Sequence, residues 1–171
     1  MDKETRNLLA KVTQDCRFLL EDEFGEQLGG TFDLFPDGRI AEAPGAPLTP
    51  AQHLVREKIV AAIHHRRSKG ESDAESVSAF VRECAFTYLN RIAALKMMEA
   101  REIAQECVSQ GDESAGFKEF WGLAPGLVAL PDRGYQLYLE CLFDEVSREV
   151  GVLFDRSDPN SLLWPRRQAL D

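Results

Sequence analysis

Long apolar runs are absent from this chain of 171 residues. No run approaches the roughly 20 apolar residues that a membrane-spanning helix needs, and residues 1–5 lack the basic-then-apolar order of a signal peptide. An apolar fraction of 44% and a charged fraction of 29% are typical of a soluble globular protein. The sequence therefore predicts a cytoplasmic protein that makes no contact with a membrane.

Residues that ligate metals are few and are not suitably spaced. The four cysteines form no Cys-x-x-Cys pair, and the three histidines add no zinc-like spacing. These residues are Cys16, Cys84, Cys107 and Cys141, with His53, His64 and His65. We expect free thiols in a reducing compartment and no metal site.

Signature motifs of common enzymes are also missing. The chain contains no G-x-x-x-x-G-K-[ST] phosphate loop, no G-x-G-x-x-G fingerprint and no G-x-S-x-G nucleophile elbow. No lysine follows a glutamate by two positions, which argues against the common acidic nuclease motif. The acids at 21–26 are interpreted as a solvated helix face, and those at 155–158 as a turn. No catalytic, cofactor-binding or metal-ligating residue is assigned.

Basic residues gather in one segment of an otherwise acidic chain. The net charge of −9 argues against a general nucleic-acid coat. Residues 51–70 nevertheless contain five basic residues and one acid, and among them Arg66, Arg67 and Lys69 are candidate contacts to DNA phosphates. Cations also suit the C-terminal end of a helix, where they complement the helix dipole. This structural interpretation is the preferred one.

The first 48 residues combine a helix with an irregular arm. Apolar residues at three- and four-residue steps predict a helix over 5–24 that ends at Gly25. Residues 25–48 are rich in glycine and proline, and they predict a short β-hairpin or an irregular arm near residues 30–40. We therefore divide the chain into residues 1–48 and a helical domain over 49–171.

The rest of the chain is predicted to be helical. Thr49 with Gln52 and Ser72 with Glu75 form two capping boxes, and each predicts the start of a helix. The second of these helices is the longest, within 71–110. Shorter helices are expected within 111–123, over 132–150 and from Pro165 onward. The predicted fold class is all-α, with about five helices and a short β-hairpin arm near residues 30–40.

One helical segment resembles a known family. Residues 86–101 read FTYLNRIAALKMMEAR, which is similar to the helix that precedes the catalytic domain in large adenine-specific (N6) DNA methyltransferases. These are the PglX-like and Eco57I-like enzymes of BREX, DISARM and restriction-modification phage-defence systems. Three further stretches are similar in kind, namely residues 56–63, residues 142–146 together with 151–155, and residues 162–170. The resemblance covers most of the chain from about residue 50.

The resemblance implies a function but transfers no catalytic residue. The family's Asn-Pro-Pro-Tyr motif, which holds a flipped adenine, and its glycine-rich loop for S-adenosylmethionine are both missing. We therefore expect an N-terminal accessory domain that positions DNA or docks a partner, truncated before a downstream catalytic domain. The implied partners are that methyltransferase domain, DNA and other defence-system subunits. The alternative is a stand-alone small helical adaptor or regulator without catalytic activity.

Asn90 and Arg91 form a polar pair within the segment that carries the resemblance. Both lie mid-helix beside apolar Leu89 and Ile92, where polar side chains need buried partners. A structural role that links helices through hydrogen bonds is the first interpretation. A contact between Arg91 and a DNA phosphate is the second.

Overall fold

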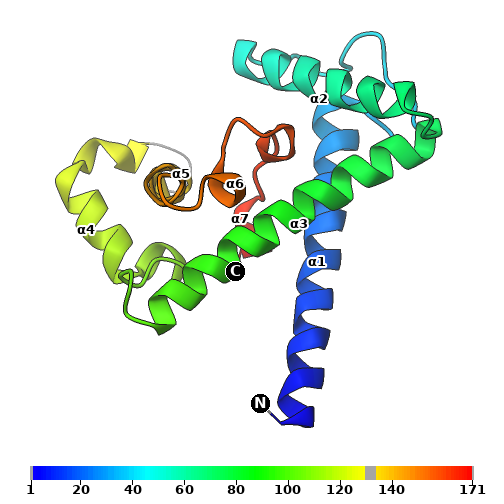
Figure 1. Cartoon of the computed structure of the whole chain (residues 1–171). Helices are drawn as coiled ribbons and strands as arrows, with labels where there is room; N and C mark the ends of the chain where they lie inside the picture. The colour runs from blue at the N-terminus through cyan, green and yellow to red at the C-terminus, as the bar shows by residue number, and fades with distance from the viewer. Residues whose placement is uncertain (1, 130–133, 171) are drawn as a thin grey trace. The chain divides into compact units, whose positions relative to one another are not determined.

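The computed structural model describes residues 2–129 and 134–170. These residues form seven α-helices and no β-strand longer than an isolated bridge (Figure 1), so the all-α prediction is confirmed. The chain divides into two compact units, the first up to Thr87 together with Ser157–Ala169 and the second over Tyr88–Arg156. We expected a boundary at residue 48. The main division lies instead between Thr87 and Tyr88, inside the helix that spans Asp73–Ala100.

Helix α1 spans Lys3–Phe32 and begins at Asp2, whose carboxylate accepts a hydrogen bond of 2.7 Å from the backbone N–H of Thr5. The predicted end at Gly25 is wrong, because the helix continues through three glycines to Asp33. Each glycine costs a helix about 1 kcal/mol relative to alanine. Phe24, Leu28 and Phe32 lie in the core of the first unit, and their burial outweighs that cost.

The predicted hairpin arm is a tight turn with one β-bridge. Leu34 and Ile40 form an isolated antiparallel bridge, and the turn between them is closed by a 2.9 Å bond from the N–H of Gly38 to the carbonyl of Phe35. Gly38 has a φ of 90°, and a Cβ at this position would lie 2.4 Å from the carbonyl carbon of Asp73. The arm therefore packs directly against the first residue of the helix that spans Asp73–Ala100.

Both predicted capping boxes are present. Helix α2 spans Pro50–Ser68 after the box made by Thr49 and Gln52. Helix α3 spans Asp73–Ala100, and its box joins the N–H of Ser72 to the carboxylate of Glu75 at 3.0 Å. Helix α3 ends ten residues before the expected limit of 110, and the chain then turns at Glu102, whose φ is 57°.

The second unit packs the end of α3 with three shorter helices. These are α4 over Ala115–Leu123, α5 over Tyr135–Val146 and α6 over Gly151–Phe154. The core is aromatic and contains Tyr88, Phe117, Tyr135, Tyr138, Phe143 and Phe154. The predicted start of a helix at Asp132 lies outside the described residues.

Short elements complete the chain. Single turns of 3-10 helix span Gly111–Glu113, Pro125–Ala129 and Pro159–Ser161. The helix expected from Pro165 is present as α7 over Arg167–Leu170. None of the helices that the structure describes is both long enough and apolar enough to cross a membrane.

Two glycines with similar backbone angles test how tightly the arm is held. Gly70 has a φ of 101°, and a Cβ added there would meet no atom within 4 Å, whereas a Cβ at Gly38 would press on the backbone of Asp73. We expect Gly70→Ala to lower the free energy of unfolding by about 1–2 kcal/mol, the cost of the left-handed conformation alone. Gly38→Ala should cost roughly 3 kcal/mol or more, because steric overlap adds to that strain. Urea unfolding of both variants measures the difference, and equal losses would show that the arm is free to move away.

Candidate functional site

The basic end of α2 is largely paired within the first unit. The guanidinium of Arg66 pairs with Glu83, and with Glu71 at 3.4 Å. That of Arg67 lies 3.1 Å from the carboxylate of Asp73 and donates to the carbonyl of Gly38. The two arginine side chains are only 18% and 21% exposed. Both groups therefore hold the arm and α3 to α2.

The three candidate phosphate contacts are thus not presented together. Of Arg66, Arg67 and Lys69, Lys69 is the one that lies in the exposed class, just after the last turn of α2. Earlier in the same helix, Arg56 donates a 2.8 Å bond to the carbonyl of Phe32 and another bond to that of Ala41. The arginines in this basic segment therefore bind neighbouring carbonyls and carboxylates.

Arg91 is a buried structural residue of the second unit. Its side chain is 1% exposed, and it donates bonds of 2.8 Å to the carbonyl of Leu153 and 2.9 Å to that of Asp155. The guanidinium lies 5.6 Å from the ring centre of Tyr88 and 5.3 Å from that of Phe143. This burial removes Arg91 from the candidate DNA contacts, and its bonds fit the structural role expected for it. Its neighbour Asn90 is half-buried on α3.

Glu99 holds the loop that follows α3, a role that sequence reasoning missed. One carboxylate oxygen accepts hydrogen bonds from the backbone N–H groups of Cys107, at 2.5 Å, and of Val108, and the other accepts from the Ser109 hydroxyl at 2.5 Å. Partial burial alone would raise the pKa of Glu99, but these bonds outweigh it and lower the pKa to about 2. We call this arrangement the Glu99 clasp. Helical periodicity could not reveal it, because its donors lie on a loop eight to ten residues away.

A second carboxylate holds the segment of residues 164–169, which we call the strap, against α1. Glu23 is 8% exposed and accepts bonds from Arg166 at 2.7 Å through Nε and at 3.0 Å through the backbone N–H. Gln27, one turn later, donates a 2.7 Å bond to the carbonyl of Trp164. Burial would raise the pKa of Glu23, and the bonds from Arg166 more than compensate and lower it. Sequence reasoning treated these acids as a solvated face and missed the contact.

An open pocket of about 460 Å³ lies beside the strap. Its walls come from one side of α1 and from the strap, namely Leu19, Asp22, Glu23, Glu26, Arg166, Gln168 and Ala169. Arg166 also pairs with Glu26 at 2.7 Å. The pocket therefore combines an apolar end at Leu19 with partly neutralised carboxylates.

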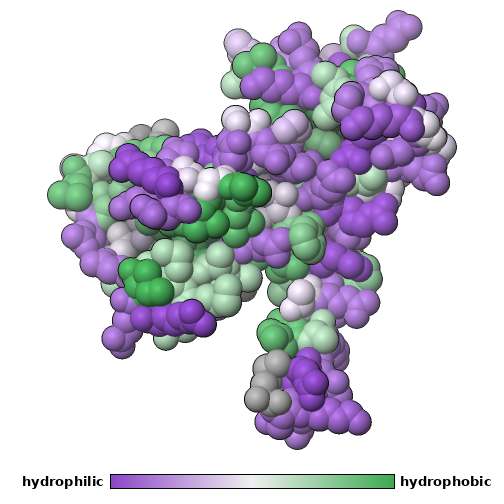
Figure 2. Space-filling view, in the orientation of Figure 1, coloured by the Kyte–Doolittle hydropathy of each residue, from purple (hydrophilic) through white to green (hydrophobic). Residues whose placement is uncertain are grey.

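The N-terminal half of α1 exposes its apolar side. The apolar residues, which we call the α1 row, recur at helical spacing and are Leu8, Leu9, Val12, Cys16 and Leu19. Their periodicity indicates a buried helix face, yet Leu8 is 62% exposed, Leu9 56%, Val12 47% and Leu19 47%. Hydrophobic side chains are visible along this part of α1 in Figure 2. A row of this kind is suited to association with another protein surface.

The described residues offer little reactive chemistry. No group of three or more His, Cys, Asp or Glu residues among them could hold a metal ion. Burial raises the pKa of the Cys84 thiol, and it raises that of Cys107 to about 12, so neither thiol is poised as a nucleophile at neutral pH. The arrangement is suited to binding, with the α1 row and the neighbouring pocket as its candidate surface.

Substitution of Arg91 tests its structural role. Arg91→Met fills a similar volume but leaves two carbonyls without their donor, so we expect the free energy of unfolding to fall by about 2–4 kcal/mol. Arg101→Met, at an exposed position on the same chain, is the matched control and should change it by less than about 0.5 kcal/mol. Urea unfolding followed by circular dichroism measures both. Equal stability of the two variants would contradict the role given to Arg91.

The Glu99 clasp predicts a pH dependence of stability. The folded-state pKa of about 2 lies below the value of about 4.3 in an unfolded chain. The contribution of Glu99 is therefore complete above roughly pH 5 and is lost as the pH falls toward 2. Glu99→Gln should lower the free energy of unfolding by about 2 kcal/mol at pH 7 and by less at pH 3. A constant difference between the two proteins across this range would argue against the clasp.

No protein-family model, no curated protein and no solved structure matches this chain. The methyltransferase family indicated by residues 86–101 therefore stays a prediction.

Proposed function

We propose that this chain is an accessory domain of an adenine-specific DNA methyltransferase in bacterial phage defence, and that it acts as a scaffold. The observation that carries the proposal is the role of the residues behind the resemblance. Arg91 bonds the carbonyls of Leu153, in the last turn of α6, and of Asp155, just after it, and Glu99 bonds backbone N–H groups of the loop that follows α3. Both residues build the second unit, which fits a helix whose pattern serves folding and not catalysis.

The charges of the chain suit docking to a protein better than positioning of DNA. A chain with a net charge of −9 repels a phosphate backbone unless it presents a local cluster of cations. Arg66 and Arg67 direct their charges at Glu83, Glu71 and Asp73 instead. The charge distribution therefore favours a protein as the principal partner.

The partner in this proposal is the catalytic domain of the methyltransferase. That domain would supply the Asn-Pro-Pro-Tyr motif and the glycine-rich loop that binds S-adenosylmethionine, because this chain contains neither. No step of methyl transfer is therefore assigned to the residues of this chain. The domain would instead hold the catalytic partner or a defence subunit in place.

The alternative is a stand-alone helical adaptor, and the α1 row favours it. Five apolar or thiol side chains at helical spacing are exposed there, which is a contact surface that needs no enzyme. An adaptor would act through an exposed apolar contact of this kind, without catalysis of its own.

Methyl transfer by the native protein tests the choice between the two functions. The protein is purified from its own host with whatever chain or subunit accompanies it, and transfer of a labelled methyl group from S-adenosylmethionine to adenine in DNA is measured. We expect transfer by this native assembly and none by residues 1–171 alone. A native assembly without adenine methylation would overturn the methyltransferase proposal and leave the adaptor.

The salt dependence of DNA binding tests the docking role separately. Each phosphate that a protein neutralises adds roughly 0.9 to the slope of log K against log salt. Because Arg66 and Arg67 are paired internally, we expect residues 1–171 to bind a DNA duplex with a slope below about 2, and Lys69→Ala to change it by less than about 1. A steep slope that Lys69→Ala reduces would restore the prediction of a DNA contact.

A further inference from the structure

We infer that the α1 row is the interface for a second copy of this chain, with the two α1 helices packed antiparallel. The inference does not depend on the methyltransferase proposal, because either an enzyme domain or an adaptor could form the pair. It rests on the exposure of the row, on the strap that interrupts it and on the charge along α1.

The first step is the state of the N-terminal half of α1. Every residue over 3–19 except Arg17 lies in the exposed class, and this part of the helix extends beyond the rest of its own unit (Figure 1). Isolated helices of about 12–15 residues are marginal in water. A helix that lacks tertiary packing over this length gains stability when its apolar side is covered.

The second step is the strap, which selects the direction of the pair. The side of α1 that carries the row continues at helical spacing from Leu19 to Glu23 and Gln27, where residues 164–166 cover it. A parallel pair would bring two straps to the same level between the helices. An antiparallel pair centred near residue 14 places each strap opposite the first turn of the partner's α1.

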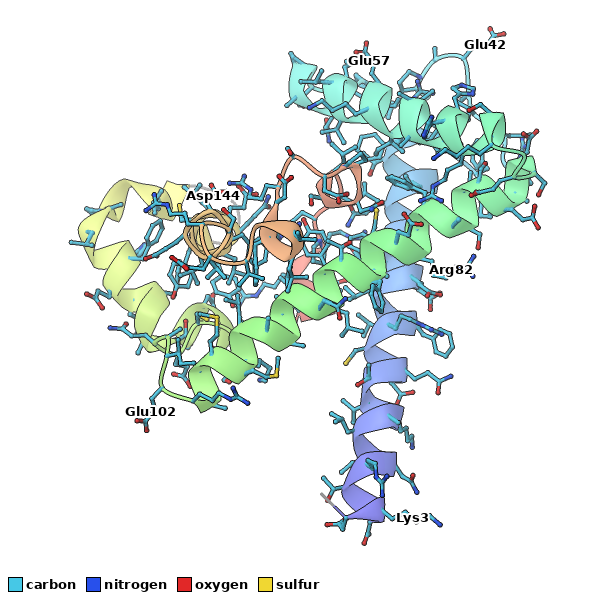
Figure 3. The ribbon with its side chains drawn as sticks, viewed as in Figure 1. Lys3, Glu42, Glu57, Arg82, Glu102 and Asp144 are labelled. Atoms are coloured by element: carbon cyan, nitrogen blue, oxygen red, sulfur yellow. The ribbon has the colours of Figure 1, made fainter. Side chains whose placement is uncertain are left out.

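The third step is charge. Residues 2–11 contain three basic residues and two acids, whereas residues 15–26 contain five acids and one basic residue. Lys3 lies at the far end of α1 (Figure 3). In the antiparallel pair, Lys3 and Arg6 reach the level of the pocket that Asp22 and Glu26 line. Arg166 neutralises part of that acidic charge, and a net negative charge remains over 15–26. A parallel pair would instead set acid against acid.

The fourth step is self-complementarity, which a two-fold interface requires. About a centre at residue 14, Leu9 lies level with Leu19 of the other copy, and Val12 lies level with Cys16 of the other copy. Each pair occurs twice by symmetry, so all of these side chains are covered at once. A single pair of helices buries less than the roughly 1,200–2,000 Å² of a standard interface, and the dimer is therefore a weak one with a Kd in the micromolar range.

Sedimentation equilibrium between roughly 1 and 300 µM tests the dimer. We expect residues 1–171 to shift from 19.2 kDa toward twice that mass as the concentration rises. Leu8→Asp with Leu19→Asp should raise the Kd at least about 10-fold. Leu54→Asp is the matched control, because Leu54 is 54% exposed on α2, outside the row, and it should leave the Kd within about 2-fold. Circular dichroism at low concentration confirms that all variants are folded.

Disulfide formation tests the direction. In a background with Cys16→Ser and Cys141→Ser, which removes the two exposed thiols, Leu9→Cys and Leu19→Cys are made as separate proteins. An antiparallel pair predicts that oxidation of the mixture links Leu9→Cys to Leu19→Cys more than it links either protein to itself. Links confined to like proteins would overturn the antiparallel arrangement.

Two results would overturn the interface itself. One is a single species of 19.2 kDa at every concentration. The other is a dimer that Leu8→Asp with Leu19→Asp leaves intact, because the contact would then lie elsewhere. Both are independent of whether the native protein methylates DNA.

Discussion

The peptide groups of the connections impose the constraint on which this fold depends. A helix satisfies the backbone of its interior, but its last carbonyls, and any turn or loop that packs against it, must find other donors and acceptors. In this chain, charged side chains that reach out from the helices supply them. Arg56 and Arg91 donate to carbonyls, and Glu99 accepts from N–H groups. Because a hydrogen bond to a charged group contributes roughly 1.5–3 kcal/mol, a few such residues can hold long irregular segments.

The pairing of Arg66 and Arg67 also changes what the basic segment of residues 51–70 indicates about function. A segment with five basic residues and one acid suggests a phosphate-binding surface when it is read along the sequence. In the fold, Arg66 and Arg67 are turned toward the arm and α3, where acids and a carbonyl meet them. With these arginines paired to acids, no cluster of free arginines offsets the net charge of −9 on the described surface of the first unit. The arginines of this segment therefore serve the packing of the first unit, and the N-terminal half of α1 exposes a row of apolar side chains.

Local signals predicted the helix starts well, and long-range packing decided the rest. The boxes at Thr49 and Ser72 need only side chains three residues apart, so the sequence contains them in full. The end of α1 depends on whether Phe24, Leu28 and Phe32 find a core, and three intervening glycines pointed the other way. The contacts of Glu99 and Glu23 were not predictable, because a carboxylate in a sequence carries no sign of which distant N–H groups it will accept.

The two halves of α1 differ in their packing within the first unit. Its C-terminal half buries Phe24, Leu28 and Phe32 in the core of the first unit, and Glu23 binds the strap. Its N-terminal half keeps the same spacing of apolar residues, but these side chains are exposed and do not join the core of the first unit. An isolated helix of that length is only marginally stable in water. The spacing of the α1 row is continuous with Glu23 and Gln27, so the exposed apolar side of α1 is aligned with the side that the strap covers. The physical consequence is a surface that the packed half of α1 holds in helical order and that association with a second copy covers.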